Sequence, residues 1–231
     1  MAFTKTLQQA RYSLARRCGV AGPTGETTSP SLTAAVLNEV INDAYHETYD
    51  ILVAKWADYF TVTGATQAMV AGTASYAVPT DFYKLRKVEL AVGSRWVRLL
   101  PHDLDVSHLY ATNGTPRRYR EQGRNVVFAP APATVESYRL WYIPIRTPLT
   151  ADSDVITFDV PQEFKLILAI AWRDTLDMQD LDPSPAIAKI DALTPMLRSA
   201  ADNRDAAEPF YLNPHGPPDE WTDDIDAWWG V

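Results

Sequence analysis

The chain has 231 residues, of which 46% are hydrophobic and 22% charged, so it contains enough apolar material for a globular core. Its formal net charge is −8, and residues 205–231 hold seven acidic residues without any Lys or Arg, which leaves −1 for residues 1–204. An end this acidic repels nucleic-acid phosphates and is not expected to bind them. A lone cysteine, Cys18, excludes an intrachain disulfide and fits a reducing compartment. Without a signal peptide or an apolar run of membrane-spanning length, no membrane contact is expected.

Two helices are predicted before residue 60. Phe3–Arg17 is expected to form a short helix, because its apolar residues recur at spacings of three and four. After a loop rich in Gly and Pro, Ser29 and Pro30 offer a cap and a first-turn proline for a second helix reaching about Tyr59. A helix of that length would span about 45 Å at 1.5 Å per residue.

The composition changes after residue 60, where short runs of Val, Leu, Tyr and Trp are separated by Gly and Pro. Apolar residues alternate with polar ones in two of these runs, 88–92 and 138–142, which is typical of half-buried strands. We therefore predict a compact antiparallel β domain here.

Helical periodicity returns at Pro161 and is interrupted at Pro183 and Pro185, and a following helix is expected to kink at Pro195. The predicted fold class is α+β: a helical bundle with an inserted antiparallel β domain and an extended C-terminal tail. The predicted parts are N-terminal helices in 1–59, the β domain in 60–160, C-terminal helices in 161–207, and an acidic Trp-rich tail in 208–231.

No catalytic or metal-binding motif is evident. The four histidines have no metal-ligand spacing, and a single cysteine cannot form a zinc site. Asp103 with Asp105, and Asp152 with Asp154, form DxD pairs that could hold a divalent cation, but turn-forming aspartates are the favoured interpretation. We expect no enzyme activity, no catalytic residue, no metal and no cofactor.

The acidic tail carries large apolar side chains that a disordered end has no reason to keep. Their spacing aligns most of them on one helical face. Docking on a partner is favoured over docking on the chain's own body, since Trp is enriched at interface hot spots. The expected partner-binding residues are Trp221, Ile225, Trp228 and Trp229, with Asp223 and Asp224 facing basic residues of the partner.

Residues 75–180 resemble the head-to-tail adaptor, or connector, proteins of tailed bacteriophages. The resemblance rests on turn and packing motifs, and residues 1–28 lie outside it. The matching positions are Tyr76, Pro79, Asp81 and Phe82; Phe128, Pro130 and Pro132; Tyr142 and Pro144; Leu149 and Thr150; Asp152, Ser153 and Asp154; and Pro161 and Phe164.

The resemblance implies a structural protein of the virion neck, made in the host cytoplasm. Such proteins form a ring, usually of twelve copies, beneath the portal protein. The ring extends the channel through which DNA passes without sequence-specific binding, and it offers a platform to tail or nozzle proteins. A C-terminal extension typically reaches the portal or a neighbouring subunit.

Two alternatives remain open from the sequence. A carbohydrate- or host-binding β module would display Trp96 and Trp141 on one concave face. A metal-dependent enzyme would use the DxD pairs.

Overall fold

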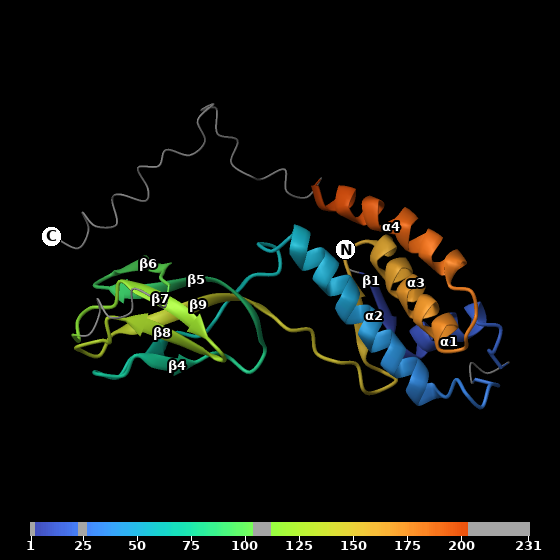
Figure 1. The fold of residues 1–231 in the computed structure, drawn as a ribbon, viewed down its shortest axis with the longest axis horizontal. Helices are drawn as coiled ribbons and strands as arrows, with labels where there is room; N and C mark the ends of the chain where they lie inside the picture. Colours follow the sequence, from blue (N-terminus) through green and yellow to red (C-terminus); the bar gives the residue numbers. More distant parts are fainter. Residues whose placement is uncertain (1–2, 23–26, 104–111, 203–231) are drawn as a thin grey trace, which may run out of the picture.

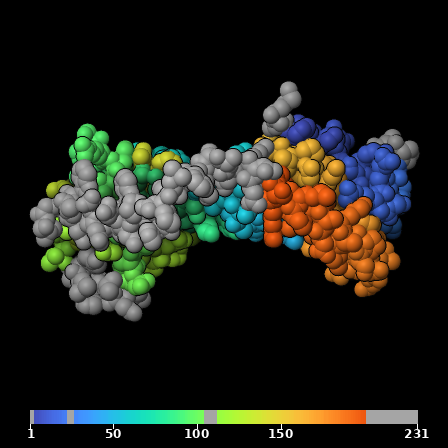
Figure 2. All heavy atoms as spheres, turned by 90° about the horizontal axis from the view of Figure 1, so that it is seen from above, coloured from blue at the N-terminus to red at the C-terminus, as the bar shows by residue number. Residues whose placement is uncertain are grey.

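The structure is a computed structural model, which describes residues 3–22, 27–103 and 112–202. It confirms an α+β fold with four helices packed together and an inserted, curled mixed sheet. Figures 1 and 2 show the helices and the larger sheet at opposite ends of an elongated molecule. The helices are α1 (Leu7–Arg17), α2 (Ala34–Lys55), α3 (Pro161–Asp177) and α4 (Ser184–Asp202). The strands are β1 (Phe3–Thr6), β2 (Val62–Thr63), β3 (Gln67–Ala68), β4 (Ser75–Ala77), β5 (Phe82–Val92), β6 (Arg95–Pro101), β7 (Arg118–Gln122), β8 (Asn125–Ala129), β9 (Ser137–Pro144) and β10 (Val155–Phe158).

The first helix begins later than the apolar spacing predicted. Phe3–Thr6 forms strand β1, which pairs antiparallel with β10, and the Phe3 ring stacks on Phe158 with 5.8 Å between centroids. Thr6 then caps α1: its hydroxyl accepts the Gln9 amide, and the Gln9 side chain accepts the Thr6 amide. This capping box fixes the helix start, so the prediction of a helix from Phe3 was wrong for these four residues.

Helix α2 is shorter than predicted. It starts at Ala34 rather than beside Ser29, because the Thr33 hydroxyl accepts the Val36 amide hydrogen bond. It ends at Lys55 and contains 22 residues, which is about 33 Å at 1.5 Å per residue. It crosses the whole bundle and reaches the sheet.

The helical core contains side chains from all four helices, including Leu14, Ile41, Leu166 and Leu197, each at most 1% exposed. As predicted, α3 starts at Pro161. The predicted interruption is shorter than expected, because α4 starts at Ser184 and includes Pro185 in its first turn, where a proline is tolerated. Helix α4 continues through Pro195, which lacks the amide hydrogen that would otherwise bond to Asp191.

The larger sheet is mixed, with strand order β2-β9-β5-β6-β7-β8-β4 and β3 also on β9. Every pairing in it is antiparallel except β6 with β7, so the prediction of a purely antiparallel domain was wrong at this pair. Two-residue turns at Gly93 and Gly123, both with positive φ, join antiparallel neighbours. By contrast, β6 ends at Pro101 and β7 begins only at Arg118, a separation in sequence that is long enough for parallel pairing.

Strand β10, which falls inside the predicted range 60–160, pairs with β1 at the helical end of the molecule. The larger sheet ends with β9 at Pro144, and residues 145–154 lead back to the helices.

The joint between sheet and bundle contains a buried ion pair. Arg146, just after β9, lies over the rings of Tyr45 and Tyr49 at 4.3 and 4.7 Å from their centroids. Its guanidinium donates to Glu163 of α3 at 2.9 Å. The Tyr49 hydroxyl also donates to the carbonyl of Pro144 at 2.8 Å. Helix α2, helix α3 and the exit from β9 are thus held at one point.

Burial dominates the electrostatics of this joint. The side chain of Glu163 is 3% exposed and that of Arg146 is 14% exposed. Burial raises the pKa of Glu163, although the charge of Arg146 acts in the opposite direction. Burial likewise raises the pKa of Tyr49 to about 12. The charge and hydrogen bond of Arg146, followed by the backbone amide of Asp159, are the contacts that favour the charged form of this carboxyl group.

Replacing Arg146 by Met is expected to lower the free energy of unfolding by about 3 kcal/mol, because it leaves Glu163 buried without its cation. The double substitution Arg146→Met/Glu163→Met removes both charges and should recover most of that loss. Urea unfolding of the two variants measures both effects. Equal destabilisation in the single and double variants would contradict a role for the ion pair.

Candidate partner-binding site

The predicted partner-binding side chains lie outside the described residues. Trp221, Asp223, Asp224, Ile225, Trp228 and Trp229 all belong to residues 203–231, so the structure does not test the site predicted for them. The hydrophobic clusters among the described residues extend from Leu7 to Leu197.

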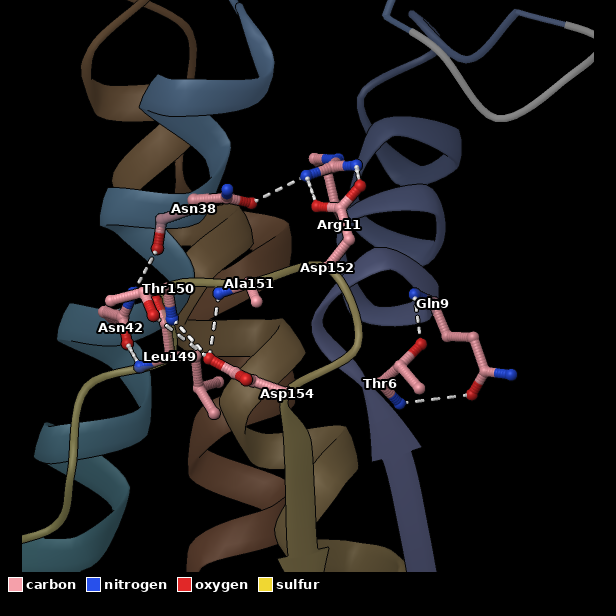
Figure 3. Close-up of polar contacts among 10 residues, drawn as sticks. All are labelled: Thr6, Gln9, Arg11, Asn38, Asn42, Leu149, Thr150, Ala151, Asp152 and Asp154. Atoms are coloured by element: carbon pink, nitrogen blue, oxygen red, sulfur yellow. Dashed lines mark hydrogen bonds and ion pairs between the residues drawn. The ribbon is translucent and has the colours of Figure 1, made fainter.

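The second DxD pair has a structural role, shown in Figure 3. Asp152 forms a two-pronged ion pair with Arg11 of α1, with distances of 2.7 and 2.9 Å. One oxygen of Asp154 accepts the backbone amides of Thr150 and Ala151 at 2.7 and 2.8 Å. These bonds lower the pKa of both carboxyl groups. The two aspartates point to different partners, which argues against a shared metal ion.

The same turn is tied to α2 by Asn42, as Figure 3 also shows. The side chain of Asn42 donates to the carbonyl of Leu149 at 2.9 Å and accepts its amide at 2.8 Å. Across residues 3–22, 27–103 and 112–202, no group of three potential metal-ligating side chains was found.

Several residues that carry the resemblance to phage adaptors meet inside the sheet. The Tyr142 hydroxyl donates to Asp81 at 3.0 Å, and its ring stacks on Phe82 with 5.8 Å between centroids. Tyr76 and Phe128 make an edge contact at 5.7 Å. These motif residues therefore position strands and turns.

Four charged side chains and two tryptophans lie together on one face of strands β5, β6 and β9. The register of these strands places the side chains together: Glu89 lies opposite both Arg98 and Arg139, and Lys87 lies opposite Trp141. The opposite face of the same strands supplies the buried residues Val88, Leu90 and Leu140. We call this surface the outer face; it consists of Lys87, Glu89, Trp96, Arg98, Arg139 and Trp141.

Glu89 is the centre of the outer face and is only 7% exposed. It accepts hydrogen bonds from Lys87 at 2.8 Å, Arg139 at 2.5 Å and the indole of Trp141 at 2.7 Å. Burial alone would raise the pKa of Glu89, but these three donors outweigh it and the pKa is lowered. Glu89 could not be singled out from the sequence, because its three donors come together only through the register of β5 and β9.

The two tryptophans of the outer face are covered by cations. The guanidinium of Arg139 lies 4.3 Å from the ring centroid of Trp96 and 5.5 Å from that of Trp141. Lys87 lies 4.1 Å from the ring centroid of Trp141. A sugar ring would have to displace these cations in order to stack on the indoles. The arrangement therefore disfavours the carbohydrate-binding alternative.

Taken together, the described polar groups hold strands, turns and helices in place, as expected for a structural protein that works through its surfaces. Comparison with known families agrees with this class. The chain matches the SU10 adaptor protein family over residues 5–226, nearly its whole length, and it belongs to this family of phage head-to-tail adaptors. No curated protein matches the chain.

The family is one of structural adaptors, which implies no catalysis and makes the protein a virion component with portal and tail partners. Within the described residues, none of the helices combines the length and apolarity needed to cross a bilayer.

Replacing Glu89 by Gln is expected to lower the free energy of unfolding at pH 7 by about 2 kcal/mol, because three donors lose a charged acceptor. Since the folded-state pKa of Glu89 is lowered, its stabilisation is complete above the unfolded pKa of about 4.3 and is lost as pH falls through the folded value. The stability difference between wild type and variant should therefore shrink below about pH 4. Urea unfolding from pH 3 to pH 7 tests this, and a difference independent of pH would contradict it.

Proposed function

We propose that this adaptor forms a ring of twelve copies beneath the portal protein. The ring extends the DNA channel and carries the tail. The observation that carries the proposal is the family match, which runs from residue 5 to residue 226 and so includes most of the acidic tail. In the ring, neighbouring adaptor subunits are partners, tail or nozzle proteins bind below, and DNA passes without sequence-specific contacts.

The shape of the protomer supports this arrangement. Helices and the larger sheet lie at opposite ends of the elongated molecule (Figures 1 and 2), so one protomer can present different surfaces to proteins above and below it. Residues 1–204 carry a net charge of only −1, so the body has little electrostatic attraction for passing DNA.

The acidic tail, residues 208–231, is proposed to anchor the adaptor to the portal or to an adjacent subunit. Its tryptophans supply large apolar contact areas, and its carboxylates speed the encounter with a basic partner surface. Several tails acting together in a ring would add avidity that a single tail lacks.

Deleting residues 209–231 is expected to leave the body folded, because the described cores end at Leu197. The same deletion should abolish portal binding, with a loss of about 2–4 kcal/mol for each hot-spot tryptophan. Circular dichroism checks the fold, and size-exclusion chromatography with purified portal checks the binding. Trp228→Ala/Trp229→Ala should reproduce most of the loss, whereas Asp223→Asn/Asp224→Asn should mainly slow association.

Unchanged affinity of the truncated protein for the portal would show that the tail is not the anchor. Unfolding of the body on truncation would instead assign the tryptophans to the protein's own core.

The isolated adaptor is expected to be monomeric or weakly associated and to close into a ring only on its partner. Light scattering of the free protein, and electron microscopy with and without portal, measure this. A stable ring of the free protein would contradict ordered assembly while leaving the adaptor function intact.

A further inference from the structure

The outer face borders a hollow that is suited to an anionic, partly apolar ligand. The hollow has a volume of about 350 Å³ and is lined by Asp58, Thr61, Arg86, Lys87, Arg98 and Trp141. Thr61 and Asp58 come from the segment that follows α2, and the other lining residues come from strands β5, β6 and β9. The hollow therefore lies where the chain enters the sheet from the helices.

The outer face and its hollow are basic in a protein that is acidic overall. Four cations, Arg86, Lys87, Arg98 and Arg139, stand against the two carboxylates Asp58 and Glu89. Asp58 is 88% exposed and its pair with Arg86 is therefore weak. Arg98 is exposed and makes no ion pair with any residue that the structure describes. A ligand carboxylate can thus gain a partner here without breaking a buried contact.

An acidic peptide suits this surface better than a nucleic acid does. Binding a phosphate backbone needs a continuous track of cations, whereas here Glu89 lies in the middle of the basic group. A peptide with separated carboxylates can place them on Arg86 and Arg98 and lay an apolar side chain beside Trp141. Residues 208–231 of this chain have that chemistry: six acidic residues, three tryptophans and no Lys or Arg.

We propose that, in the free protomer, residues 208–231 dock on the outer face of the same chain. In Figure 1, the C-terminal end of helix α4 points toward the sheet. Residues 203–231 follow this end, and a fully extended chain of 29 residues could span about 100 Å. A tethered segment meets a site on its own chain at an effective concentration in the millimolar range, so a modest affinity suffices. Before assembly, this contact covers the tryptophans that the portal or a neighbour later takes over.

The seven tryptophan indoles of the full-length protein allow a direct test by ¹⁵N-resolved NMR, with Trp→Phe variants for assignment. The indole of Trp141, held by Glu89, reports on the outer face; those of Trp221, Trp228 and Trp229 report on the tail. Arg98→Glu should shift the tail indoles, and Asp223→Asn/Asp224→Asn should shift Trp141. Salt at 1 M should cause the same shifts in wild type, because the Debye length falls to about 3 Å.

Lys5→Glu is the matched control, since it makes the same charge change at an exposed site on β1, at the helical end. It should leave the indole positions unchanged. The proposal would be overturned if Arg98→Glu left the chemical shifts of the tail indoles unchanged and the tail substitutions left that of the Trp141 indole unchanged. Shifts that grow with protein concentration would place the segment on a second copy and overturn the intramolecular contact. A third outcome separates the two proposals. If Trp228→Ala/Trp229→Ala reduces portal binding but the tail and Trp141 indoles do not respond to each other's substitutions, only the intramolecular contact is refuted and the proposed function stands.

Discussion

The buried pair between Arg146 and Glu163 holds the two parts of the molecule in one arrangement. An inserted domain is joined to its host by two connecting segments, and without further contacts it would be free to rotate about them. Here the second connection is fixed as soon as it leaves β9, because the Arg146 guanidinium is held between two tyrosine rings of α2 and a carboxylate of α3. Ile143 packs with Tyr49 and Val53 beside it. A cation in this position gives direction to a contact that apolar packing alone would leave less specific.

This joint has a functional consequence for an adaptor. A protein that links two assemblies must transmit their relative position, so the angle between its helical end and its sheet must be defined. Charge burial is costly, and an apolar cluster of similar volume is often more stable. The presence of Arg146 and Glu163 at the joint is therefore better explained by the geometry they impose than by the stability they add.

Elements were predictable from the sequence where local signals and tertiary structure agree. Helix α3 starts at Pro161, α4 starts directly after Pro183, and the alternation at 88–92 lies in strand β5. Elements were not predictable where a distant segment decides the local conformation. Phe3 fits a helical pattern, yet it forms a strand because β10 offers a pairing partner about 150 residues later in the chain. The parallel pairing of β6 with β7 likewise depends on the long separation between them in the chain. The alternation of apolar and polar residues indicates a strand but not the direction of its neighbour.

The same limit applied to surface sites. Lys87, Glu89, Arg139 and Trp141 are ordinary strand residues in the sequence, and only the register of β5 against β9 brings them around one carboxylate. In contrast, the tail was recognisable at once, because tryptophans among carboxylates are unusual in any context. Composition can therefore single out a candidate binding segment, whereas the surface proposed to receive it is made of residues far apart in sequence and requires the fold.

The two proposed contacts of the tail differ in the way that a sequential assembly requires. Docking on the chain's own outer face relies on exposed charges, which are individually weak and are screened by salt. Docking on the portal buries tryptophans and is repeated around the proposed ring, so that tails bound together gain from effective concentration. Each protomer would give up one weak intramolecular contact in exchange for a strong one that exists only in the assembly. The energetic difference between the two states then comes from the tryptophan area buried in each portal contact and from the number of copies, so a free protomer can stay unassembled while a portal with many equivalent sites recruits a full set.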